Sequence, residues 1–228
     1  MSIMEIKERV AAIREEIAAL SGGREVKLLA ATKTRTAEEI QAAFAAGIDA
    51  AGENKAQEFR DKLLSGAFGD GEVHFFGHLQ SNKLKYVVGR AALIHSVDSV
   101  PLLRAIDTMA GERGVCQNVL AEVNIGREPG KHGLNPEELT GFLDAAADFC
   151  HIKVMGLMTV APIAEIPDEN REYFAKMYQL FIDNQAEKRD NVVMKYLSMG
   201  MSGDYRAAIS EGSNMVRIGT GIFGLRQY

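Results

Sequence analysis

Short apolar segments alternate with helical patterns along almost the whole of this 228-residue chain. Eight segments are predicted to be strands, and each is followed by a helix or a turn. The predicted strands cover residues 27–33, 48–54, 72–79, 92–98, 118–125, 152–160, 195–201 and 215–220. Strands that alternate with helices pair in parallel through right-handed crossovers. Because eight such units close most naturally into a barrel, we expect an α/β fold with a single (β/α)₈ barrel.

The alternative architecture is an open doubly wound sheet, which leaves the count of eight strands unexplained. Apolar side chains at steps of three and four through residues 1–20 predict an amphipathic helix ahead of the first strand. Thr36 and Glu39 form a capping box at the start of the next helix, and Gly47 is typical of its end. We therefore expect one domain over residues 1–228, in which the first twenty residues form an extra helix.

The composition excludes several classes of partner and environment. A formal net charge of −5 and a pI near 5.6 argue against a nucleic-acid or anionic-membrane surface. No apolar run approaches the roughly 20 residues of a membrane span, and the charged N-terminus is unlike a signal peptide. Cys116 and Cys150 are far apart and outside any CxxC motif, which indicates reduced, buried thiols in a cytoplasmic protein.

Near the end of the chain, Gly219, Gly221 and Gly224 spell the G-x-G-x-x-G pattern of a dinucleotide-binding turn. That site also needs a helix after the glycines and an acidic residue about twenty positions further on. Only residues 225–228 follow, so a dinucleotide site is excluded. In a barrel, the loops after strands seven and eight commonly bind phosphate. The hydroxyls of Ser202 and Thr220 and the backbone amides of these glycines are suitable donors.

A lysine and an arginine lie beside this predicted phosphate site. Lys33 ends the first strand, which neighbours strand eight in a closed barrel, and it is either a solvated cation or an amine that forms a Schiff base. Pyridoxal phosphate carries both a phosphate and an aldehyde. Arg217 lies two residues before Gly219 on the same strand face, and arginine is a known partner for the pyridine nitrogen. The alternative is a phosphosugar barrel without a cofactor, in which Lys33 acts on a sugar carbonyl.

Six short motifs follow one another in a specific order across almost the whole chain. They are AATKTR around Lys33, GENKAQE from Gly52, FFGHLQSNK from Phe75, GLMT from Gly156, SMGMSGD from Ser198 and VRIGTGIFG from Val216. In this order and spacing the chain resembles the pyridoxal phosphate homeostasis proteins. That family is similar to the barrel domain of alanine racemase but lacks its second, β-rich domain. The resemblance implies a fold-type III barrel without the C-terminal β-domain.

The resemblance also implies a site that binds pyridoxal phosphate. The cofactor would be held as a Schiff base on Lys33, with Arg217 toward the pyridine nitrogen. Phosphate contacts are expected from Ser202, Gly219 and Thr220. Asn54 is expected near the cofactor ring, and His78, Met158 and Met199 are expected to line the pocket.

The predicted function is that of a carrier in vitamin B6 homeostasis. Arginine does not give up its proton, so the ring nitrogen opposite Arg217 stays unprotonated and the cofactor is a weak electron sink. A racemase also needs a second base, which in alanine racemase is a tyrosine from the extra domain of the partner subunit. The alternative is a fold-type III amino-acid racemase or decarboxylase, with His78 and Tyr205 as candidate bases.

The remaining expectations concern metals and partners. His74 and His78 share a spacing that chelates metal on a helix, but on a strand they would lie about 13 Å apart, so no metal site is expected. The expected partners are pyridoxal phosphate and the apo-enzymes that receive it, without nucleic acid or membrane. Without the domain that builds the racemase dimer, the chain is expected to be a monomer.

Overall fold

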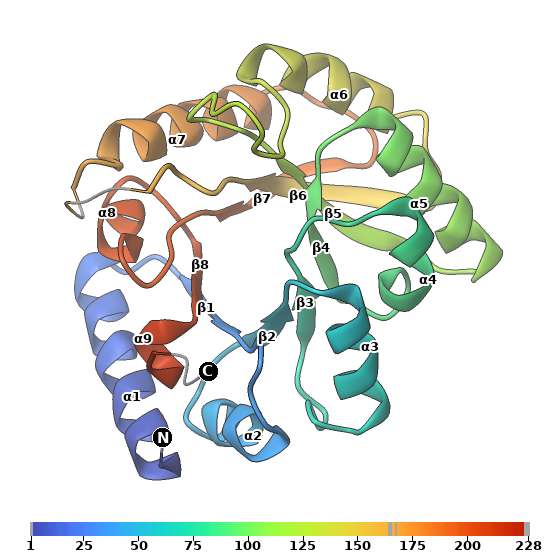
Figure 1. Ribbon diagram of the computed structural model, residues 1–228. Coiled ribbons are helices and arrows are strands. Elements are labelled where there is room, and N and C mark those ends of the chain that lie inside the picture. The colour runs from blue at the N-terminus through green and yellow to red at the C-terminus, as the bar shows by residue number, and fades with distance from the viewer. Residues whose placement is uncertain (1, 164–165, 167, 226–228) are drawn as a thin grey trace.

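Eight parallel strands close into a barrel in strict chain order in the computed structural model, which describes residues 2–163, 166 and 168–225 (Figure 1). The strands are β1 (Lys27–Ala31), β2 (Ala50–Glu53), β3 (Val73–Phe75), β4 (Leu93–Val97), β5 (Gln117–Glu122), β6 (Ile152–Met158), β7 (Val192–Ser198) and β8 (Met215–Ile218). The ring closes where β1 pairs with β8, with Leu29 opposite Arg217. The predicted barrel is confirmed, and each of the eight predicted segments overlaps one strand. The largest boundary error is at β3, which ends at Phe75, four residues before the predicted residue 79.

Helices form an outer ring around the strands. They are α1 (Ile3–Leu20), α2 (Ala37–Ala45), α3 (Ala56–Leu64), α4 (Leu84–Val87), α5 (Val100–Glu112), α6 (Leu139–Ala146), α7 (Arg171–Gln185), α8 (Tyr205–Ser210) and α9 (Thr220–Phe223). The predicted capping box is present at α2, where the Glu39 amide donates to Thr36 Oγ1 and the Thr36 amide donates to Glu39 Oε2. Gly47 follows α2 with φ +102°, a backbone conformation that glycine adopts without strain.

The last strand is followed only by the four-residue helix α9, which is too short to cover it. Instead, the first helix of the chain lies over β8 and β1, beside α8 and α9 and next to α2 (Figure 1). Its buried apolar side chains are Ile6, Val10, Ile13 and Ile17. They belong to the same core cluster as Leu28 of β1 and Val216 and Ile218 of β8. Helix α1 therefore completes the outer ring that α9 leaves open.

Strand residues alternate between the outer core and the inside of the barrel. The inner cluster consists of Leu29, Ala50, Leu93, Leu120, Met158 and Met215. His95, Glu122 and Arg217 each lie two residues after a member of this cluster, so they share its inward direction and are buried. Polar and charged groups are thereby placed inside the barrel, toward the carboxyl ends of the strands.

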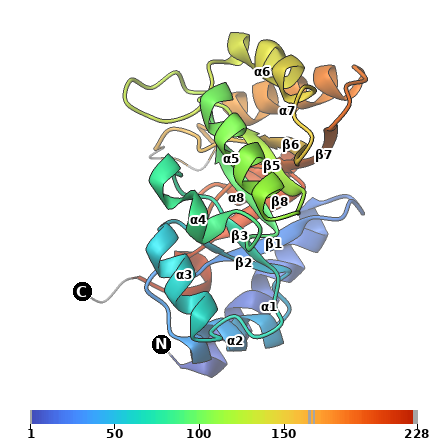
Figure 2. The same cartoon turned by 90° about the vertical axis from the view of Figure 1, so that its right-hand side faces the viewer.

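The two ends of the barrel carry different loops. In the side view of Figure 2, the long loop between β5 and α6 projects from one end, and the loop between α1 and β1 projects from the other. Cys116 and Cys150 lie in the short loops before β5 and β6 and are exposed and free, so the prediction that they are buried was wrong. Connecting loops run over the surface even next to buried strands. Among the described residues, no helix is both long enough and apolar enough to span a membrane.

Candidate functional site

A cavity of about 450 Å³ opens at the carboxyl ends of the strands, on the loops where barrels carry their sites. Its lining residues are Ala31, Lys33, Arg35, Asn54, Phe76, Val160, Met201, Ser202, Gly203, Arg217, Gly219 and Thr220. Six of the predicted site residues are therefore brought together in one cavity. They come from the ends of β1, β2, β7 and β8.

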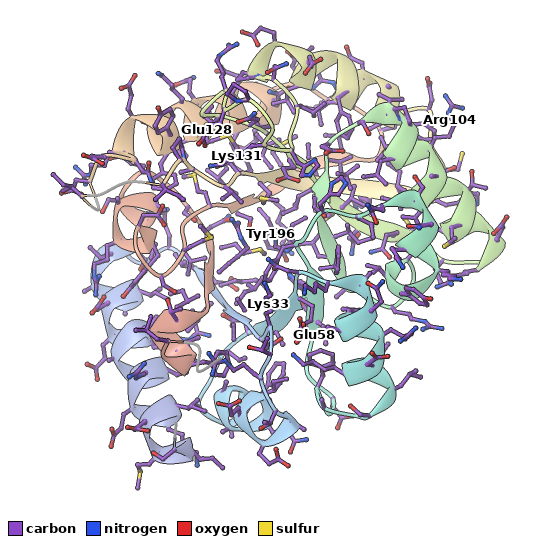
Figure 3. The ribbon with its side chains drawn as sticks, viewed as in Figure 1. Lys33, Glu58, Arg104, Glu128, Lys131 and Tyr196 are labelled. Atoms are coloured by element: carbon purple, nitrogen blue, oxygen red, sulfur yellow. The ribbon has the colours of Figure 1, made fainter. Side chains whose placement is uncertain are left out.

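Lys33 lies two residues after the end of β1, within the ring of strands, whereas Arg104 lies on the outer ring of helices (Figure 3). Its side chain is half-buried and, among the described residues, makes no hydrogen bond or ion pair. The next residue, Thr34, has φ +65°, which is uncommon for a residue with a side chain. Its amide donates to Glu58 Oε1 over 2.5 Å. The turn is thus held from α3 while the Lys33 amine stays free.

A largely buried cluster of ionic side chains packs against this turn. Lys62 Nζ lies 2.6 Å from Glu53 Oε1 and 2.8 Å from Glu58 Oε1, and it also donates to the Thr32 carbonyl. The Thr32 hydroxyl donates to the same Glu53 oxygen over 2.6 Å. Burial raises the pKa of Glu53, although Lys62 opposes that effect. The cluster ties the end of β1 to β2 and α3.

The loops after β7 and β8 meet through one hydroxyl group. Ser202 Oγ accepts hydrogen bonds from the amides of Gly219 at 3.2 Å and Gly221 at 3.1 Å. A Cβ atom on Gly221 would lie 2.8 Å from Cγ2 of Ile218, the last residue of β8, so a side chain at this position would disturb the turn that follows β8. Amides and a hydroxyl gathered in this way at the start of α9 form a cradle suited to an anion. The Thr220 hydroxyl belongs to the same cavity wall.

Arg217 begins a chain of buried hydrogen bonds that runs through the inside of the barrel. It donates to Ser198 Oγ over 2.6 Å and to the Thr159 carbonyl over 2.9 Å. Ser198 Oγ lies 3.1 Å from His95 Nδ1. His95 Nε2 lies 2.9 Å from His74 Nδ1. We call Glu72, His74, His95, Ser198 and Arg217 the interior chain.

The far end of the interior chain is Glu72, which lies just before β3 and is partly exposed; its Oε1 is 2.8 Å from His74 Nε2. Arg217 can only donate, and an ionised Glu72 can only accept. The bonds between them must therefore all run in one direction, which places the proton of each neutral imidazole on Nε2. Burial lowers the pKa of His95 well below its usual value, and His74 and Arg217 add to this effect. Burial also lowers the pKa of Arg217 to about 10, so its guanidinium remains charged near neutral pH.

Glu122, at the end of β5, is a second buried charge that the sequence analysis did not identify. Burial raises its pKa to about 7, and the neighbouring Asp98 raises it further while Arg217 opposes it. One sequence pattern could have identified the buried polar residues His74, His95, Glu122 and Ser198. Each is a polar residue inside an apolar strand, at an alternate position that faces away from the outer helices.

The structure corrects two of the pocket predictions. Met199 is fully buried, but it belongs with Leu197 to the outer core beneath the helices, because alternate residues of a strand share one face. The expectation that Met199 lines the cavity is therefore wrong; Met201 takes that place. His78 is exposed and stacks on His132 at the barrel rim, outside the cavity lining.

Two further candidates also lie elsewhere. Met158 is part of the apolar cluster inside the barrel and is not among the lining residues of the cavity. Tyr205 is buried against α1, where its hydroxyl donates to Glu16; burial, followed by that contact, raises its pKa to about 12. Tyr205 therefore faces α1, not the cavity. Arg35, Phe76 and Val160 line the cavity without having been predicted.

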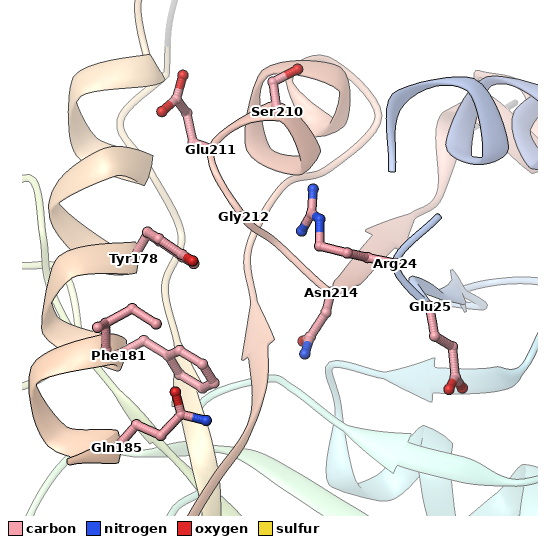
Figure 4. A pocket seen from close by; sticks show the side chains of 10 residues that line it. Arg24, Glu25, Tyr178, Phe181, Gln185, Ser210, Glu211, Gly212 and Asn214 are labelled. Carbon is pink, nitrogen blue, oxygen red and sulfur yellow. The ribbon is translucent and has the colours of Figure 1, made fainter. Parts of the chain in front are cut away.

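A second cavity of about 540 Å³ lies at the other end of the barrel, between α7 and the segments before β1 and β8 (Figure 4). Its cationic side chain, Arg24, is already bonded to three backbone carbonyls, those of Ser21, Ile209 and Ser213. No catalytic or anion-binding arrangement is found among the described residues there. The cavity that contains Lys33 is therefore the candidate site.

Known proteins resemble this chain in both sequence and structure. The family model for the alanine racemase N-terminal domain matches residues 4–227. The pyridoxal phosphate homeostasis protein of Aquifex aeolicus is 42% identical over 202 residues, which are 89% of this chain and 88% of that protein.

Two solved structures extend the comparison. PipY of Synechococcus elongatus, solved with pyridoxal phosphate bound, is 33% identical, with a TM-score of 0.85 over 96% of this chain and 100% of PipY. Alanine racemase of Corynebacterium glutamicum is 17% identical, with a TM-score of 0.70 over 99% of this chain but 62% of the racemase. The racemase likeness concerns the fold alone, and the barrel corresponds to only part of the larger enzyme.

Proposed function

Since this chain belongs to the family of pyridoxal phosphate homeostasis proteins, with an alanine racemase N-terminal domain fold, we propose that it binds pyridoxal phosphate in the cavity that contains Lys33. The observation that carries this proposal is the pairing of a free lysine amine with an anion cradle in one cavity. When bound, the cofactor supplies an aldehyde that bonds reversibly to amines. The Lys33 amine is the covalent attachment point.

The residues present fit both ends of such a ligand. The Ser202 hydroxyl accepts from the Gly219 and Gly221 amides and can donate its own proton to a phosphate, and the Thr220 hydroxyl lies in the same cavity wall. Lys33 lies two residues after β1, the strand next to β8, and has no competing ion pair among the described residues. One cavity thereby offers a nucleophilic amine and an anion site on adjacent strands.

Arg217 is assigned to the pyridine nitrogen. Its contacts with Ser198 and Thr159 use two of its five N–H donors, and it lines the cavity. Since its pKa of about 10 keeps it protonated, it holds the ring nitrogen free of a proton. A ring in that state withdraws electrons weakly, which favours storage of the cofactor over carbanion chemistry.

The cavity wall also supports a carrier role. Apart from Lys33, its described lining residues include no histidine, tyrosine or carboxylate to act as the second base of a racemase. We propose that the protein holds pyridoxal phosphate as a monomer in the cytoplasm and releases it to apo-enzymes. The two exposed free thiols are consistent with a reducing compartment.

Borohydride reduction followed by peptide mass mapping tests the attachment. In the wild-type protein loaded with pyridoxal phosphate, we expect one pyridoxyl group, on Lys33, and visible absorption before reduction. Lys33→Ala should lose both signals, whereas Lys153→Ala, at an exposed position of β6, should keep them. Equal visible absorption of Lys33→Ala and wild type would rule out the assigned bond.

The rival function is amino-acid racemisation or decarboxylation with the same cofactor. Loaded protein incubated with L-alanine should retain the optical activity of the solution over many hours. Racemisation at ordinary enzyme rates of about 1–10³ s⁻¹ would replace the carrier role with a catalytic one.

A further inference from the structure

Three side chains with metal-binding atoms converge at the rim of the barrel, outside the cofactor cavity. His78, Asp98 and His132 lie on the loops after β3, β4 and β5. His78 Nδ1 is 4.0 Å from Asp98 Oδ2, and His132 Nδ1 is 3.7 Å from the same oxygen. One ligand atom from each residue lies within 4.8 Å of the other two. We propose that these three residues bind a divalent transition-metal ion of the Zn²⁺ class.

The donor set favours this class of ion. Two imidazole nitrogens and one carboxylate oxygen suit Zn²⁺, Ni²⁺ or Cu²⁺, whereas Mg²⁺ and Ca²⁺ prefer oxygen ligands alone. Ligands about 2.0–2.2 Å from a tetrahedral ion lie about 3.4 Å apart. The separations to Asp98 exceed this value only slightly, so rotation of exposed side chains can close the site. Three protein ligands leave a fourth position for water or another small ligand.

The charge on Asp98 gives a second reason to expect a cation here. Its side chain is only 15% exposed, and among the described residues its ion-pair partners are two histidines, without a lysine or arginine. Its negative charge also raises the pKa of the buried Glu122. A metal ion would satisfy a carboxylate that the described chain leaves without a permanent positive partner.

The two imidazole rings are neighbours that stack face to face, so one ring must turn before both nitrogens can bind the same ion. Their centroids are 3.6 Å apart and their planes differ by 9°. His74, which the sequence spacing suggested as a metal-binding partner of His78, instead contacts His95 inside the barrel. The second histidine of the proposed site is His132, which lies on the loop after β5.

Calorimetric titration of the full-length, untagged protein with Zn²⁺ tests the site, both with and without pyridoxal phosphate. Cys116 and Cys150 should first be changed to serine, because exposed thiols also bind zinc. We expect one Zn²⁺ per chain, with the Kd increased at least about tenfold by His132→Asn and by His78→Asn. Mg²⁺ should not compete.

His151→Asn is the matched control. His151 Nδ1 lies 3.7 Å from Asp107 Oδ1, the same separation as the His132–Asp98 pair, and both histidines are exposed. The proposed site at the barrel rim contains two histidines. Among the described residues, His151 and Asp107 are not part of such a group. An unchanged Kd for His151→Asn, together with weakened binding in the two rim variants, would support the site. Absence of Zn²⁺ binding, or equal weakening by all three changes, would overturn it.

The identity of the ligands can be read independently of affinity. With Co²⁺ bound, the imidazole NMR signals of His78 and His132 should be displaced by the paramagnetic ion, and X-ray absorption should show two imidazoles together with oxygen donors from Asp98 and the fourth ligand. Displacement of other histidine signals instead would place the ion elsewhere and contradict the proposal.

Discussion

At the end of β5, the carboxyl group of Glu122 is nearly buried and interacts with both Asp98 and Arg217. Asp98 repels its charged form, and Arg217, at the candidate pyridine position, attracts it. With a pKa of about 7, this carboxyl group changes its protonation within the physiological pH range. Its charge therefore sets part of the electrostatic field around the base of the cavity.

Glu122→Gln should change how stability depends on pH. The folded-state pKa of about 7 lies above the ordinary value of 4.5, so the folded protein binds this proton more tightly than the unfolded chain. The resulting stabilisation is present below about pH 4.5 and is lost as the pH rises through about 7. Relative to wild type, the variant should gain about 3 kcal/mol in unfolding free energy between pH 4 and pH 8.

Urea denaturation at a series of pH values measures this difference. Glu8→Gln, which changes an exposed carboxyl group on α1, is the control and should show little relative change. Parallel pH curves for wild type and Glu122→Gln would contradict the assigned burial of this charge.

Among the helices, α1 has a structural role that its position ahead of the barrel does not reveal. The barrel needs an apolar cover over β8 and β1, and α9 is only four residues long. The apolar stripe of α1 supplies that cover. The cofactor cradle lies on the loop after β8, so the packing of α1 supports the site from behind.

Ile6→Ala and Ile3→Ala form a matched pair on this helix. Ile6 is fully buried, whereas Ile3 is 49% exposed. Ile6→Ala should reduce the unfolding free energy by about 2–4 kcal/mol, through lost burial and the cavity left behind. Ile3→Ala should cost under about 1 kcal/mol. Equal losses in denaturant unfolding would show that α1 does not pack as described.

Through the whole molecule, the interior chain links the two ends of the barrel. It begins at Glu72, before the start of β3, and ends at Arg217 in the cofactor cavity. Since Arg217 donates at one end and Glu72 accepts at the other, one arrangement of protons satisfies every member. A buried polar network of this kind holds Arg217 in one orientation.

NMR of histidine side chains tests this arrangement in the protein without cofactor. His95 should carry its single proton on Nε2, and its pKa should lie well below the usual value of 6.5, because burial opposes its charged form. The surface residue His151 is the internal comparison. A proton on Nδ1, or a His95 pKa at or above the usual value of 6.5, would show that the chain does not run in the assigned direction.

Much of the fold could be predicted because it depends on local patterns. Alternating strand and helix signals, the capping box at Thr36 and the count of eight strands led to the barrel, which the structure confirms. Chain order then placed Lys33 beside the glycine turn, because β1 and β8 are neighbours in any closed eight-stranded barrel. Six of the predicted site residues accordingly line one cavity. Met199 was misassigned because it was taken from the family resemblance without applying strand alternation, which places it in the outer core.

The sequence by itself determined the barrel and the end of it that carries the site, since helix and strand periodicity and strand order are properties of the chain. The tertiary structure alone decided which polar side chains meet: His74 with His95 inside the barrel, and His78 with His132 at its rim. The physical reason is that these contacts depend on the register between strands and on side-chain orientation across segments far apart in sequence. Local propensity carries no information about either.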